Sequence, residues 1–147
     1  MTDKFQSILD KPASAIERPK PIPPGTYLTV VQGLPRYDKS SKKQTEFVEF
    51  TLALAAAMDD VDSEALEAAG GIVGKTLRAT YYLTEDAAWR LKKFLTDLGF
   101  DTESDKFTLR QMIEESVNQQ VYAKVKQRPS QDGKAIFAEL ADTAKVD

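Results

Sequence analysis

Several stretches of the chain alternate between apolar and polar residues with a period of two, which is typical of β-strands that bury one face. The clearest alternation places Val48, Phe50, Leu52 and Leu54 on one side of a strand and Phe47 on the other. The pattern, together with β-branched residues and flanking turn formers, predicts five strands. They cover 27–32, 44–54, 75–83, 120–128 and 135–141.

One longer stretch instead repeats its apolar residues with helical spacing. It begins at Thr84, carries two acids in its first turn and reaches Gly99. We expect Thr84 to cap this helix and Gly99 to end it. Trp89 lies outside the apolar arc, on the opposite side of the helix. A shorter helix is predicted over 108–115, where a threonine and a glutamine have the spacing of a capping box.

The predicted order is β-β-β-α-β-β, with the long helix between the third and fourth strands. This is the order of the OB-fold, a five-stranded Greek-key barrel. We therefore predict a mainly β protein with an OB-fold domain over 25–141 and a short C-terminal tail over 142–147. The acidic stretch 58–74 is interpreted as an insertion with a short helix, capped by Asp62 or Ser63.

Residues 1–24 contain five of the seven prolines. Proline fixes φ and removes a backbone donor, so this segment is expected to form an extended, Pro-rich N-terminal arm. The arm and Trp89 are candidate contacts for a homo-oligomer or for another protein.

The composition narrows the possible chemistry. The chain has no histidine and no cysteine, which excludes an imidazole base, a thiol nucleophile and ordinary zinc, copper or haem sites. Asp59, Asp60 and Asp62 resemble a magnesium site, but they lie in the predicted insertion and lack a rigid strand to hold them. We therefore expect a protein that is not an enzyme and has no cofactor. Because no apolar run spans a membrane and no secretory signal is present, we expect a cytoplasmic protein.

The distribution of charge favours a nucleic-acid partner, although the net charge is −3. Cations gather in 18–43 and 122–134, with one acid in each segment, whereas the charged residues of 59–67 are all acids. Charges that are segregated in this way create a local positive field even on an acidic protein.

The predicted fold brings those cations close to aromatic residues. An OB-fold binds oligonucleotides across its second and third strands, between the loop that joins strands one and two and the loop that joins strands four and five. Cations there follow the phosphates, and each aromatic ring stacks on a base with about 1–3 kcal/mol. The predicted nucleic-acid-binding residues are Arg36, Tyr37, Lys39, Lys42, Lys43, Phe47, Arg78, Tyr82, Tyr122, Lys124, Lys126 and Arg128.

Each strand aromatic also has a purely structural interpretation. Phe47 would pack beneath the Pro-rich arm, and Tyr122 would pair across strands. Tyr82 would point inward if the third strand contained a bulge, because the pair Tyr81-Tyr82 is ambiguous in register.

Several motifs carry a resemblance to a known family. They are Pro24-Gly25-Thr26-Tyr27, residues 46–54, residues 74–77 leading into 82–84, and above all Ala88-Trp89-Arg90-Leu91-Lys92-Lys93-Phe94-Leu95 followed by Leu98-Gly99. With these motifs, the chain from about 24 to 128 resembles small phage-encoded domains found among replication and recombination genes, regarded as OB-fold single-strand binders.

The resemblance implies largely sequence-independent binding of single-stranded DNA in support of phage replication or recombination, in the cytoplasm of the host cell. It also implies contacts with replication or recombination proteins. The acidic insertion and the arm depart from the short family pattern, as does a C-terminus in which Lys145 dilutes the acids. The residues leave DNA and RNA both open. The alternative function is a protein–protein interaction module on the same barrel with no direct nucleic-acid binding.

A salt titration tests the predicted groove. If about 3–5 of its cations touch phosphates at once, the slope of log affinity against log salt for a single strand should be about −2 to −3.5. A binding constant that does not change with salt would contradict the groove.

Overall fold

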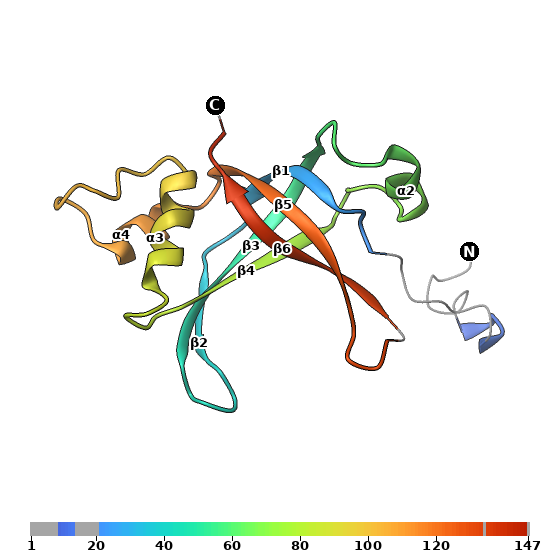
Figure 1. Cartoon of the computed structure of the whole chain (residues 1–147), viewed down its shortest axis with the longest axis horizontal. Coiled ribbons are helices and arrows are strands. Elements are labelled where there is room, and N and C mark those ends of the chain that lie inside the picture. Colours follow the sequence, from blue (N-terminus) through green and yellow to red (C-terminus); the bar gives the residue numbers. More distant parts are fainter. Residues whose placement is uncertain (1–8, 14–20, 134, 147) are drawn as a thin grey trace.

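The computed structural model describes residues 9–13, 21–133 and 135–146. Within these residues the chain forms six β-strands and three α-helices (Figure 1). The strands are β1 (Gly25–Val31), β2 (Arg36–Lys39), β3 (Glu46–Ala57), β4 (Thr76–Tyr82), β5 (Gln120–Pro129) and β6 (Ile136–Ala144). The helices are α2 (Ser63–Ala68), α3 (Ala88–Asp97) and α4 (Leu109–Glu115). The protein is therefore mainly β, as predicted.

The six strands form one antiparallel sheet in the order β2-β3-β1-β5-β6, with β4 paired to the other edge of β3. Because β3 is 12 residues long, its first part pairs with β2 and its last part with β1 along the same edge. The prediction had five strands in a closed barrel. Among the described residues no ladder joins β4 to β6, although both strands line one surface hollow. The sheet is open there, and barrel closure is not shown.

The strand that was not predicted is β2, which lies where a loop was predicted. β2 pairs with the start of β3, and a backbone hydrogen bond of 2.9 Å from Ser40 to Thr45 closes the turn between them. All four residues of β2 are exposed, because the hairpin extends beyond the core. A strand that buries neither face has no apolar alternation, so the sequence pattern does not reveal it.

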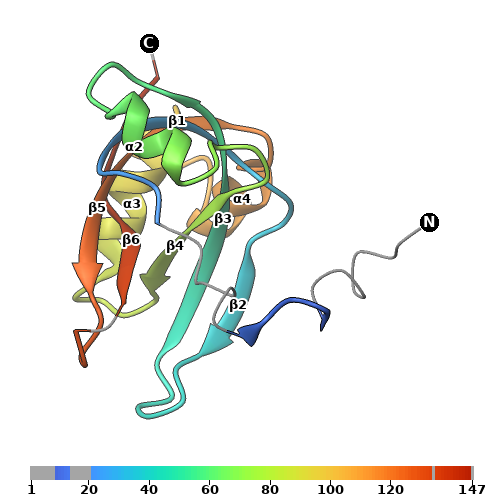
Figure 2. The same ribbon diagram turned by 90° about the vertical axis from the view of Figure 1, so that its right-hand side faces the viewer.

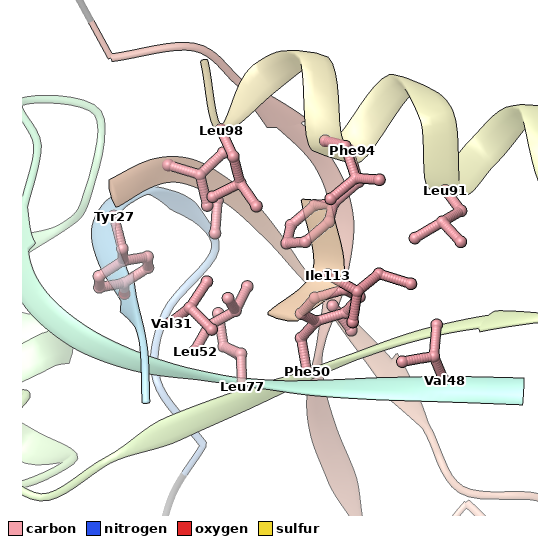
Figure 3. Packing of buried hydrophobic residues seen from close by; sticks show 14 of the residues in the cluster. Tyr27, Val31, Val48, Phe50, Leu52, Leu77, Leu91, Phe94, Leu98 and Ile113 are labelled. Carbon is pink, nitrogen blue, oxygen red and sulfur yellow. The ribbon is translucent and has the colours of Figure 1, made fainter. Parts of the chain in front are cut away.

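The core lies between the inward face of the sheet and the helices α3 and α4 (Figure 3). Val48 and Phe50 are fully buried on β3, and the ring of Phe94 from α3 lies 4.7 Å from that of Phe50. The Tyr81 ring packs on the same side, 5.0 Å from Phe94. Since neighbouring residues of a strand face opposite sides, Tyr82 points outward. The register left open by the pair of tyrosines is thereby settled.

The last residues of the predicted arm are part of the folded domain. Ile22 and Pro23 are buried. The Tyr27 hydroxyl donates to the Pro23 carbonyl at 2.7 Å, and the Gln127 side-chain amide donates to the Ile22 carbonyl at 3.1 Å. The arm predicted over 1–24 therefore ends in a segment that packs on the sheet. Residues 1–8 and 14–20, which make up most of that arm, lie outside the described residues.

The acidic stretch 58–74 contains α2, and Asp62 caps this helix by accepting from two backbone N–H groups of its first turn. The Asp60 carboxylate accepts from the backbone N–H and the hydroxyl of Thr26, both at 2.8 Å. These two acids therefore hold the insertion together and fasten it to β1. In the part of the chain that the structure describes, no group of three or more acids is placed to hold a metal ion.

The helix ends follow the sequence signals in part. The Thr84 hydroxyl accepts from the Ala87 N–H at 3.3 Å, but α3 begins only after Ala87, so the predicted cap was wrong. Gly99 follows the end of α3 with φ of 103°, as predicted. Both hydrogen bonds of the capping box between Thr108 and Gln111 are present in α4. None of the helices described is long and apolar enough to cross a membrane.

The buried hydroxyl of Tyr27 generates a stability prediction. Replacing Tyr27 with phenylalanine removes its hydrogen bond to Pro23, so the free energy of unfolding at neutral pH should fall by about 1 kcal/mol in urea denaturation. Burial, and after it the Asp60 carboxylate, raises the pKa of Tyr27 from 10.0 to about 12. The folded state holds the proton of Tyr27 more tightly than the unfolded state does. The stabilisation that the protonated hydroxyl gives the folded state is therefore complete below pH 10 and is lost as the pH rises to about 12.

The variant should therefore lose less stability than the wild type over that alkaline range. An equal alkaline loss in both proteins would show that the hydroxyl of Tyr27 is not the group that titrates.

Candidate nucleic-acid interface

The outward faces of β3 and β4 carry an aromatic pair. The strand register places Phe47 opposite Tyr82, with ring centroids 6.1 Å apart and an interplanar angle of 73°. Tyr82 is 44% exposed, and Phe47 is half-buried. Such an edge-to-face pair is a favourable aromatic contact. It presents ring surface on the side of the sheet that the helices leave uncovered.

β2 adds a cation to this pair. The Arg36 guanidinium lies 5.6 Å from the centroid of the Phe47 ring, within the range of a cation–π interaction. It also contacts the carboxylates of Asp38 and, at 3.5 Å, Glu49. The backbone N–H of Lys39 and the guanidinium of Arg36 hold the pKa of Asp38 below its usual value. Arg36 is thus held beside the ring by two acids.

The turn between β2 and β3 supplies two further cations. Lys42 and Lys43 line a surface hollow together with Tyr82 and Thr84, so the turn lies next to the aromatic pair. Among the described residues, neither lysine has a carboxylate within ion-pair distance. Both ammonium groups are therefore available to a ligand.

Arg78 extends the same face along β4. It pairs with Thr51, is exposed, and points to the same side as Tyr82 because the two are four residues apart. That spacing corresponds to about 13 Å along an extended strand. Beside Arg78, the hollow between β4 and β6 also contains Glu139.

Two predicted residues of the hairpin lie on its other side. Tyr37 pairs with Val48, and Lys39 with Glu46, so both side chains share the side that faces the core farther along β3. The Arg110 guanidinium lies 5.9 Å from the centroid of the Tyr37 ring. The register therefore places Tyr37 and Lys39 on the opposite side of the sheet from the aromatic pair, although both line a surface hollow that Phe47 also reaches.

Tyr122 and Lys124 lie farther away, on β5, which pairs with β1 rather than with β3 or β4. Tyr122 is half-buried opposite Leu28. Hydrogen bonds from Thr26, and more weakly the charge of Lys124, hold the pKa of Asp60 below its usual value. Lys124 is thus close to the acidic insertion, and these two residues are not gathered with the aromatic pair.

Lys126 and Arg128 are ion-paired. Both contact Glu139 of β6, at 3.3 Å from Lys126 and 2.9 Å from Arg128. Glu49 and Glu139, the acids of the site, were not among the residues predicted from the sequence. Both occupy outward positions of predicted strands, and that alternation is the signal that marks them.

The structure thus gathers half of the predicted residues on one surface, which we call the β3–β4 face. It consists of Arg36, Lys42, Lys43, Phe47, Arg78 and Tyr82. The β2–β3 hairpin and the β5–β6 hairpin project in the same direction, away from α2 (Figure 1; Figure 2).

Trp89 lies on α3, away from this face. It is 60% exposed and lines a hollow that also contains Phe107, Leu109 and Met112. The Arg90 guanidinium lies 5.4 Å from the centroid of its ring. The described part of the Pro-rich arm contributes no residue to this hollow, and the homo-oligomer stays a prediction.

No protein-family model matches the chain, and no curated protein matches it. Among solved structures, the chain is similar to yeast RPA bound to ssDNA, with 9% sequence identity and a TM-score of 0.35. The alignment covers 97% of this chain and 86% of that chain. At this TM-score the likeness does not define the fold, so a function is inferred from the residues of the β3–β4 face. The resemblance to a phage family stays a prediction.

Proposed function

We propose that the chain binds single-stranded DNA across the β3–β4 face, largely without regard to base sequence, and catalyses no reaction. The observation that supports this most directly is the aromatic pair of Phe47 and Tyr82, which lies outward with Arg36 over one ring. On this proposal the six-stranded sheet is an OB-fold, and the β3–β4 face corresponds to the surface with which OB-folds bind oligonucleotides.

The aromatic and the cationic side chains of the β3–β4 face would bind different parts of the DNA. Aromatic rings stack on bases of any sequence because every base has a π-face, and this favours a single strand, whose bases are not paired with a second strand. The ammonium groups of Lys42 and Lys43 lie next to Tyr82 and have no acid partner among the described residues, which suits contact with phosphates. The surface therefore combines base stacking with neutralisation of the backbone.

The biological setting follows from the resemblance. We propose that the chain supports phage DNA replication or recombination in the host cytoplasm, in contact with proteins of those processes.

The alternative is a protein–protein interaction module with no direct nucleic-acid binding. The observation that favours it is the exposed Trp89 beside Phe107, an apolar surface outside the β3–β4 face. On this alternative, no oligonucleotide binds to the wild-type protein.

Two tyrosines of nearly equal exposure provide a matched test. Tyr82 and Tyr37 are 44% and 45% exposed, but only Tyr82 belongs to the β3–β4 face. In fluorescence-anisotropy titrations with labelled oligo-dT, Tyr82→Ala and Phe47→Ala should each weaken binding by about 1–3 kcal/mol through the loss of a stacking ring. Tyr37→Ala should bind like the wild type.

Thermal melts of the three variants verify that each is folded before binding is compared. Oligo-dA should show the same losses, and duplex DNA should bind more weakly than either single strand. Titration with oligo-U decides whether RNA binds as well. If Tyr82→Ala retains full affinity, or if Tyr37→Ala loses as much, the β3–β4 face is not the binding surface.

A further inference from the structure

The outward faces of β5 and β6 hold one carboxylate between two cations. The ladder places Lys126 directly opposite Glu139, and Arg128 is two residues farther on the same face of β5. Glu139 contacts both cations, at 3.3 Å from the Lys126 ammonium and 2.9 Å from the Arg128 Nε. The side chains of the two cations remain 60% and 61% exposed, whereas that of Glu139 is 33% exposed. Both cations can therefore still be reached from solvent.

Glu139 also connects this group to the β3–β4 face. It lines a hollow between β4 and β6 together with Arg78, which lies on the outward side of β4 with Tyr82. A strand of DNA that leaves the aromatic pair along β4 passes Arg78 and then reaches Glu139.

A carboxylate and a phosphodiester are alike in the ways that matter here. Each is an anion with two oxygen acceptors, and each suits the donor geometry of an arginine and a lysine. An exposed ion pair contributes little to stability, so exchange of one anion for another costs little. Glu139 thus occupies the position in which a phosphate would be bound.

Resting on the proposed function, we propose that Lys126 and Arg128 form a phosphodiester-binding subsite of the same interface, in which Glu139 takes the place of the phosphate while no DNA is bound. DNA binding then requires displacement of the Glu139 side chain from its two partners. Glu139 therefore limits the affinity of the protein for DNA and the number of phosphates that the protein contacts.

The test compares Glu139→Gln with Glu103→Gln. Both variants remove one negative charge that pairs with a cation, but Glu103 pairs with Lys92 of α3 at 2.9 Å, away from the interface. Anisotropy titrations with oligo-dT are run over a series of salt concentrations. Glu139→Gln should bind at least about threefold more tightly at low salt, and its log–log salt slope should steepen by about 0.7 for each added phosphate contact. Glu103→Gln should change neither quantity beyond the small effect of net charge.

A second substitution tests whether the increase in affinity comes from the cations that pair with Glu139. Adding Arg128→Gln to Glu139→Gln should remove part of the gain in affinity and in slope, because it removes one of the two released cations and leaves Lys126. If the wild type binds through Phe47 and Tyr82 but Glu139→Gln behaves like Glu103→Gln, the subsite is refuted and the proposed function stands. If the wild type and all variants fail to bind oligo-dT, both proposals are refuted.

Discussion

Between residues 48 and 54 of β3, every second side chain is buried in the core and the side chains between them face outward. The buried positions fix the register, because a shift by one residue would turn the apolar set towards solvent. Phe47 is therefore held outward by the packing of its neighbours Val48 and Phe50. The position of the candidate interface thus depends on the core, since the same alternation that buries one face presents the other.

The length of β3 explains how the hairpin of the interface arises. Its first residues pair with β2 beyond the limit of the core, and the later residues pair with β1. Sequence alternation predicted the core strands because each buries one face. It missed β2, whose four exposed residues form a strand only through pairing with β3. The long-range pairing that creates β2 leaves no local signal, so this segment was assigned to a loop.

Whether a predicted cation is ion-paired with an acid could not be derived from sequence either. Whether Lys126 meets an acid depends on which residue of β6 stands opposite, and a bulge between Lys124 and Val125 shifts that register. A bulge inserts one residue into one strand, which changes every later pair. Without it, Lys126 would face Leu140 on a simple continuation of the pairing between Lys124 and Asp142. One irregularity therefore decides that this cation is paired with Glu139.

The same reasoning separates the cations into two groups. Arg36 and Lys126 stand within a ladder opposite Glu49 and Glu139, and each is ion-paired with that acid. Lys42 and Lys43 lie in a turn, where no residue stands opposite, and among the described residues they have no acid partner. On a protein with a net charge of −3, a local positive field depends on such unpaired positions more than on the number of cations. On the proposed function, the turn lysines next to Tyr82 are accordingly available to phosphates, and the paired cations of β5 become available only when another anion replaces their carboxylate.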